Sequence, residues 1–172
     1  MARLEQHRVL QCRKTNASMN EPAKKLEQEI DISLVLPGQV SMIWDKCEKI
    51  LTRSCKRSGG RINPQDIYMR CIENRSSLWI IFETDSLNII GCGVTQLHDY
   101  PSGLRMLNVE HIAGKRYPEW VDKGFDTLYK WAKDNKADGI EALGRPGFWN
   151  WIKKEKGWEE TSRFYEFKFD KE

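Results

Sequence analysis

Apolar positions recur along the chain with two different periods, and these predict alternating strands and helices. Short apolar or alternating runs between turn residues are typical of strands. We expect such strands at residues 30–36, 78–82, 89–97, 104–113, 140–143 and 158–169. Apolar residues spaced three and four apart predict amphipathic helices that open near Pro37, Pro64, Pro118 and Pro146.

The order of these elements indicates the fold class. Three consecutive strands can pair antiparallel through short turns, and the strand–helix–strand unit after them predicts a parallel crossover. We therefore expect an α/β (α+β) fold: a mixed, mostly antiparallel sheet of about six strands with helices on both faces. The last strand alternates between two unlike faces, with Tyr165, Phe167 and Phe169 on one and Phe164, Glu166 and Lys168 on the other.

Charge divides the chain into two parts. Residues 1–28 hold six basic and three acidic residues, which accounts for the whole net charge of +3, and the remainder holds 22 of each sign. We expect a basic flexible arm over residues 1–28 and one domain over residues 29–172. A body without net charge makes a poor footprint for nucleic acid, so any contact with nucleic acid should be non-specific and made through the arm.

Several classes are excluded by composition and spacing. No apolar run approaches the ~20 residues that span a bilayer, and the start of the chain has no apolar signal segment. The five cysteines form no C-x-x-C pair, so we expect reduced thiols. His98 and His111 fall about six residues apart along the predicted hairpin, or ~20 Å, which is too far for one ion. We therefore expect no metal site.

The order of elements over residues 30–170 resembles the GNAT-type acetyltransferase fold. In that family a loop of the form Q/R-x-x-G-x-G/A follows the fourth strand, and acetyl-CoA is bound there. The matching stretch here is Gly114-Lys115-Arg116-Tyr117-Pro118-Glu119-Trp120. The resemblance implies that Gly114, Lys115 and Arg116 would contact the cofactor if acyl-CoA binds. The spacing departs from the family, Pro118 removes an amide donor and Glu119 adds negative charge, so we expect no usual pyrophosphate cradle.

The amino-acid sequence of the second half also resembles a narrower group, the degenerate GNAT-like proteins of short-tailed bacteriophages. The residues that carry this resemblance are 78–82 (LWIIF), 89–91 (IIG), 99–101 (DYP), 132–133 (AK) and 144–149 (GRPGFW). Some members are internal virion proteins. The resemblance implies a core or ejection component that contacts other phage structural proteins, located in the virion or the host cytoplasm.

Glu110 is the candidate catalytic residue. Several GNAT enzymes place a glutamate on the fourth strand, where it takes a proton from the amine that attacks the thioester. The alternative is a partly exposed strand carboxylate or a salt-bridge partner. The tyrosine acid usual in the family has no counterpart between Phe148 and Trp151.

Candidate partner-binding residues lie in the arm and near the last helix. Arg145 follows the fifth predicted strand, where it could bind an anion or a partner carboxylate. The alternative is a tight strand-to-helix turn that needs glycine at both ends, at Gly144 and Gly147. Two tryptophans on opposite sides of a short helix leave at least one exposed, which favours a protein interface. The candidates are Arg3, Arg8, Arg13, Lys14, Arg145, Trp149 and Trp151.

Two functions from different classes follow. The first is a non-catalytic GNAT-like phage protein that acts through protein–protein contacts and needs no cofactor. The alternative is an acyl-CoA-dependent N-acetyltransferase, which would use acetyl-CoA.

Overall fold

A computed structural model of the chain describes residues 28–144, 146–154, 157–163 and 165–169, apart from the side chains of Pro146 and Trp151. The elements are β1 (Ile30–Val35), a single 3-10 turn η1 (Pro37–Gln39), α1 (Val40–Lys56), α2 (Pro64–Ile72), β2 (Ser77–Glu83), β3 (Ile89–Asp99), β4 (Arg105–Gly114), α3 (Tyr117–Asp134), β5 (Gly139–Ala142) and α4 (Pro146–Ile152).

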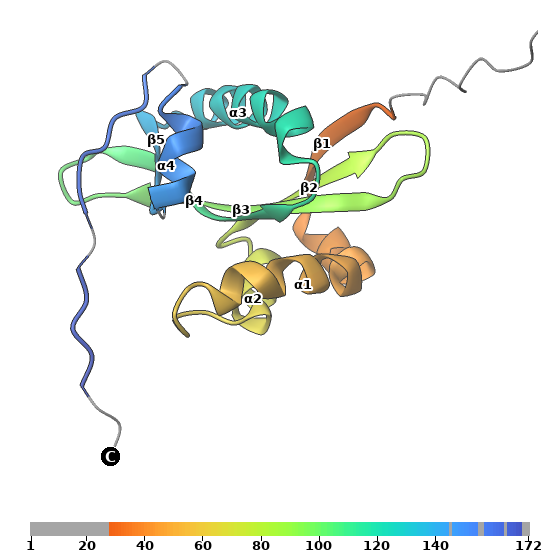
Figure 1. Cartoon of the computed structure of the whole chain (residues 1–172), viewed down its shortest axis with the longest axis horizontal. Coiled ribbons are helices and arrows are strands. Elements are labelled where there is room, and N and C mark those ends of the chain that lie inside the picture. The colour runs from red at the N-terminus through yellow and green to blue at the C-terminus, as the bar shows by residue number, and fades with distance from the viewer. Residues whose placement is uncertain (1–27, 145, 155–156, 164, 170–172) are drawn as a thin grey trace, which may run out of the picture.

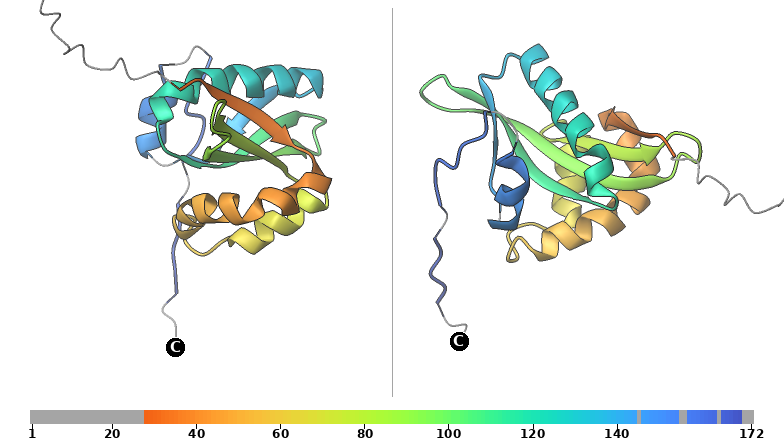
Figure 2. Two further views of the ribbon diagram at one scale, coloured as in Figure 1. Left: turned by 90° about the vertical axis from the view of Figure 1, so that its right-hand side faces the viewer. Right: turned by 45° about the horizontal axis from the view of Figure 1, so that its top comes forward.

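Five strands form one sheet in the order β1-β2-β3-β4-β5. The first three pairings are antiparallel, and β4 pairs with β5 in parallel through the crossover helix α3. Helix α3 covers one face of the sheet, and α1 and α2 cover the other (Figures 1 and 2). The expected mixed, mostly antiparallel sheet between helical layers is confirmed.

Local sequence signals explain where helices begin. The Asn63 side chain accepts from the Asp66 backbone N–H at 3.0 Å, and Asp66 accepts from the Asn63 N–H at 2.9 Å. This capping box, with Pro64 at the first helical position, satisfies donors that the first turn of α2 leaves free. Helix α3 begins after Arg116, whose backbone is left-handed with φ of 56°.

Each face of the sheet packs its own apolar cluster. The cluster under α1 and α2 includes three thiols with almost no exposure, Cys47, Cys71 and Cys92. Burial raises the pKa of the Cys71 thiol to about 11. The four cysteines of the described chain are free thiols that serve as small apolar residues. The second cluster, under α3, is centred on Trp120.

The predicted sixth strand is absent from the described chain, where residues 158–163 and 165–169 form no strand. Two contacts explain the difference. The Trp158 ring packs 5.9 Å from the Phe125 ring, and Glu166 forms an ion pair with Arg61 in the α1–α2 connection. The segment is therefore held beside the helices. Helix α4 also ends earlier than expected, at Ile152.

No helix of the described residues is long and apolar enough to cross a membrane. The proposed arm, residues 1–28, lies outside the description except for Gln28.

Candidate functional site

A bulge in β4 brings Glu110 and His111 together at the candidate site. Thr95 pairs with Val109 and Val94 pairs with His111, which leaves Glu110 as an extra residue on β4. A bulge interrupts the alternation of side chains between the two faces. Glu110 and His111 consequently both contact the α1–α2 layer, although they are neighbours in a strand.

Glu110 is held by one neighbour from α2 and one from the connection between α2 and β2. Arg70 of α2 forms an ion pair with its Oε2 atom, and the Ser76 hydroxyl donates to the same oxygen at 3.4 Å. The Glu110 side chain is 14% exposed, so its charge needs this partner. Neither contact uses Oε1. Glu110 is thus a salt-bridge partner of Arg70, and its Oε1 atom takes part in neither contact.

His111 is buried beside this ion pair. Its Nδ1 atom lies 2.8 Å from the Ser54 hydroxyl of α1. Burial, followed by the nearby charge of Arg70, lowers the pKa of His111. The ring is therefore held in its neutral form at neutral pH. From the sequence alone His111 is a candidate only for a metal ligand, because its place beside α1 depends on the bulge and on the register between β3 and β4.

The bulge coincides with the point where two parallel strands part. The last pair between β4 and β5 joins Val109 to Ala142. Beyond it β4 continues from Glu110 to Gly114 with no strand on that side in the described chain. Glu110 thus marks the start of a backbone edge that an extended, amide-containing ligand could pair with.

Gly114 has a structural role in the loop after β4. A Cβ atom there would lie 2.8 Å from the Cα of Gly91 and 3.0 Å from the Ile90 carbonyl oxygen. The next residue holds β4 close to β3, because the Lys115 N–H donates to that same carbonyl at 2.9 Å. Gly114 is thus required for close packing of β4 against β3.

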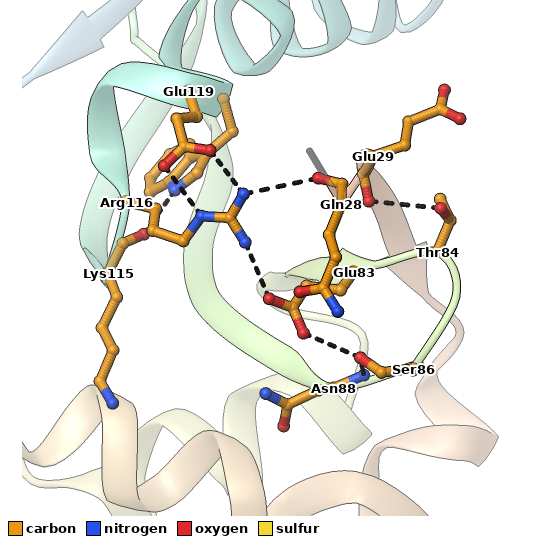
Figure 3. Close-up of polar contacts among 10 residues, drawn as sticks. Gln28, Glu29, Glu83, Thr84, Ser86, Asn88, Lys115, Arg116 and Glu119 are labelled. Carbon is orange, nitrogen blue, oxygen red and sulfur yellow. Dashed lines mark hydrogen bonds and ion pairs between the residues drawn. The ribbon is translucent and has the colours of Figure 1, made fainter. Parts of the chain in front are cut away.

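Arg116 ties three parts of the chain together (Figure 3). Its Nε donates to Glu119 at 2.8 Å, its Nη1 to Glu83 at 2.8 Å and its Nη2 to the Gln28 carbonyl at 3.4 Å. The carboxylate of Glu119 is the main cause of a raised pKa at Arg116. Lys115 points away from this cluster in Figure 3.

The Arg116 cluster leaves little free positive charge for an anion at the start of α3. Two carboxylates already neutralise the guanidinium of Arg116. The Glu119 N–H donates to the Arg116 carbonyl at 3.0 Å, the Lys115 N–H is bonded to Ile90, and Pro118 has no N–H. A pyrophosphate would find few amide donors here and would compete with Glu83 and Glu119. Our expectation that the loop lacks the usual cradle is consistent with this geometry and stays a prediction.

The predicted partner-binding residues fall mostly outside the description. Arg145 and the arm residues Arg3, Arg8, Arg13 and Lys14 are among the positions that the structure does not describe, and so is the side chain of Trp151. Trp149 lies half-buried in α4. Their predicted contacts stay predictions.

The cavity between α3 and the sheet is small and apolar. It measures about 40 Å³, and Thr95 is one of its few polar lining residues. Its volume suits a single water molecule better than a substrate. Over the described ranges, no cluster of histidine, cysteine or carboxylate side chains could hold a metal ion.

Known structures share this fold. A ribosomal-protein-alanine N-acetyltransferase of Brucella melitensis matches with a TM-score of 0.61 at 14% identity, over 83% of this chain and 100% of its own. A predicted acetyltransferase of Clostridium acetobutylicum, solved with acetyl-CoA, matches at 0.59 and 16% identity, over 81% and 96%. The chain has the GNAT acetyltransferase fold.

Other GNAT-fold structures match at similar levels. An aminoglycoside acetyltransferase from an uncultured soil sample gives a TM-score of 0.60 at 11% identity, over 82% of this chain and 99% of its own. At such identities the likeness shows the fold alone. No family model and no curated protein sequence matches the chain.

Proposed function

We propose that the protein is an acyl-CoA-dependent N-acetyltransferase that acts on a primary amine. The observation that carries the proposal is the position of Glu110, in the bulge where β4 and β5 part. The fold supports it, since the Clostridium acetobutylicum structure of the same fold was solved with acetyl-CoA. The Brucella melitensis and soil-sample proteins are named as N-acetyltransferase and aminoglycoside acetyltransferase.

The free edge of β4 suits the pantetheine end of acyl-CoA, whereas carboxylates at the start of α3 oppose its phosphate end. The free edge of β4 from Glu110 to Gly114 suits the amides of a pantetheine chain. At the start of α3, Lys115 and Arg116 supply the positive charge for phosphates, but Glu83 and Glu119 occupy Arg116. We therefore expect weak binding, in which phosphate and the two carboxylates compete for the same guanidinium.

Glu110 would act as the general base. The cofactor supplies an acyl thioester, and the reaction needs an acceptor for the proton that the attacking amine loses. Arg70 fixes the carboxylate through Oε2, which leaves Oε1 to accept that proton. His111, neutral and adjacent, is too enclosed by α1 to meet an amine directly, so we assign it a positioning role.

A second function rests on the Arg116 cluster. A loop closed by its own carboxylates suits a protein that no longer binds a cofactor. In that case the chain is a non-catalytic GNAT-like component of a phage particle that acts through protein contacts. The resemblance to phage proteins at residues 78–82, 89–91, 99–101, 132–133 and 144–149 supports this function.

Calorimetry with acetyl-CoA separates the two functions. Binding in the micromolar range, accompanied by acetyl transfer to a primary amine, supports the enzyme. No heat at millimolar acetyl-CoA contradicts the enzyme and supports the protein-contact role. Desulfo-CoA is the control, because it tests the phosphate end without the reactive thioester.

A further inference from the structure

Three aromatic side chains near the end of the chain are exposed to an unusual degree. Tyr165, Phe167 and Phe169 are 84%, 82% and 87% exposed. They alternate with Glu166 and Lys168, so in an extended chain they share one face. The Phe167 and Phe169 rings lie 5.4 Å apart, edge to face. Residues 165–169 therefore have the pattern of a strand with one apolar face, but no sheet covers that face in the described chain.

The segment is held away from the sheet of its own chain. Glu166 pairs with Arg61 in the α1–α2 connection and also accepts from Lys168 at 3.0 Å. In all the ribbon views the segment runs away from the sheet instead of returning along β5 (Figures 1 and 2). Its aromatic face thus points to solvent, where apolar clusters of this kind mark interaction sites.

The outer edge of β5 is the complementary feature. β5 is the last strand of the sheet, and within the described residues no strand pairs with its outer side. Ile140 pairs with Leu107 and Ala142 with Val109, so both side chains lie on the face under α3. Glu141 lies on the opposite face, where it accepts from the Tyr100 hydroxyl at 3.0 Å.

We propose that residues 165–169 pair as a strand with the outer edge of β5 in a second copy of this chain. The aromatic face would then continue the apolar face formed by Ile140 and Ala142. The polar face would lie on the side of Glu141, where the Lys168 ammonium can meet that carboxylate. Both faces of the segment thus match the two faces of the edge that it joins.

A second copy fits better than an unrelated protein because each chain carries both halves of the contact. Two copies related by a two-fold axis exchange both segments and satisfy both edges. Six aromatic side chains, at ~150–250 Å² each, would bury roughly 900–1,500 Å². This is close to the area of specific interfaces, about 1,200–2,000 Å² in total.

Cross-linking between two differently labelled chains tests the exchange. In a Cys12→Ser background, one preparation carries Glu141→Cys and the other Lys168→Cys. A disulfide that joins the two different chains is expected on mild oxidation of the mixture. The matched control replaces Glu141→Cys by Ser33→Cys, an exposed position on the opposite edge strand β1, and should give no mixed dimer.

Two outcomes would overturn the proposal. One is the absence of mixed dimers with Glu141→Cys when both proteins are folded by circular dichroism. The other concerns a single chain that carries both Glu141→Cys and Lys168→Cys: an intrachain disulfide without dimers would show that the segment joins β5 of its own chain.

Light scattering after size exclusion gives an independent test. We expect the wild type to be dimeric at tens of micromolar and Phe167→Ser to weaken the dimer by about tenfold or more. Met42→Ser, which removes an equally exposed apolar side chain (81% exposed) from α1, should leave the dimer unchanged. A monomeric wild type, or an equal loss in both variants, contradicts the exchange.

Discussion

Arg70 and Glu110 form an ion pair that joins α2 to the bulge of β4. The pair is mostly shielded from water, so each charge depends on the other. Because both the ion pair and the Ser76 hydroxyl use Oε2, the carboxylate is fixed in orientation while its Oε1 atom keeps capacity to accept a proton.

Glu110→Gln should reduce acetyl transfer by about 10²-fold or more, since the amide cannot accept the proton of the amine. Initial rates with a primary-amine acceptor measure the effect. Glu73→Gln is the matched control, because Glu73 pairs with Arg75 at an exposed position. Full transferase activity in Glu110→Gln would exclude Glu110 as the base.

Glu119→Gln should strengthen acetyl-CoA binding by about threefold to tenfold at low salt. The substitution frees the Arg116 guanidinium from its closest carboxylate, so phosphate meets less competition. Titration calorimetry gives the dissociation constant, and the gain should shrink as salt screens these exposed charges. If the constant does not change, the Arg116 cluster does not limit binding.

The free energy of unfolding should fall as the pH drops below about 6.5, the usual pKa of histidine. The folded pKa of His111 is lowered, so the unfolded state binds more protons in this range and acid favours unfolding. Urea denaturation at pH 7.5 and pH 5.5 measures the change. His111→Gln should flatten the dependence, and an unaltered slope in that variant would assign the effect to other groups.

Gly114→Ala should lower the free energy of unfolding by about 1–3 kcal/mol, because the added methyl group meets the backbone of β3. Gly38→Ala is the control, since a Cβ at Gly38 meets nothing within 4 Å. Urea midpoints of the two variants give the comparison. Equal stability of the two would mean that β3 and β4 can move apart at this point without cost.

Elements that depend on local signals were predictable from the sequence. Pro64 marks the start of α2, and the apolar run over 78–82 marks β2. The hairpin turn also lies where it was expected, with the Tyr100 N–H bonded to the Leu104 carbonyl at 2.8 Å. In each case the information lies within a few residues of the element.

Features that depend on distant partners could not be predicted. The bulge at Glu110 is set by the register of β4 against β3, and the residues of β4 alone do not predict it. The Arg116 cluster joins residues that lie 33 and 88 positions apart in the chain. The alternating pattern at the end of the chain predicted a strand but could not specify whether a sheet edge would be within its reach.

The short pairing between β4 and β5 has a consequence for how the fold opens. β5 has only four residues, all half-buried, and lies at one edge of the sheet, whereas β2 and β3 are flanked by strands on both sides. Backbone amides of β5 should therefore exchange with deuterium through local fraying, well before the central strands open. If the terminal segments of two chains cover each other's β5, the fraying depends on protein concentration. Dilution alone would then speed deuterium uptake by the amides of β5.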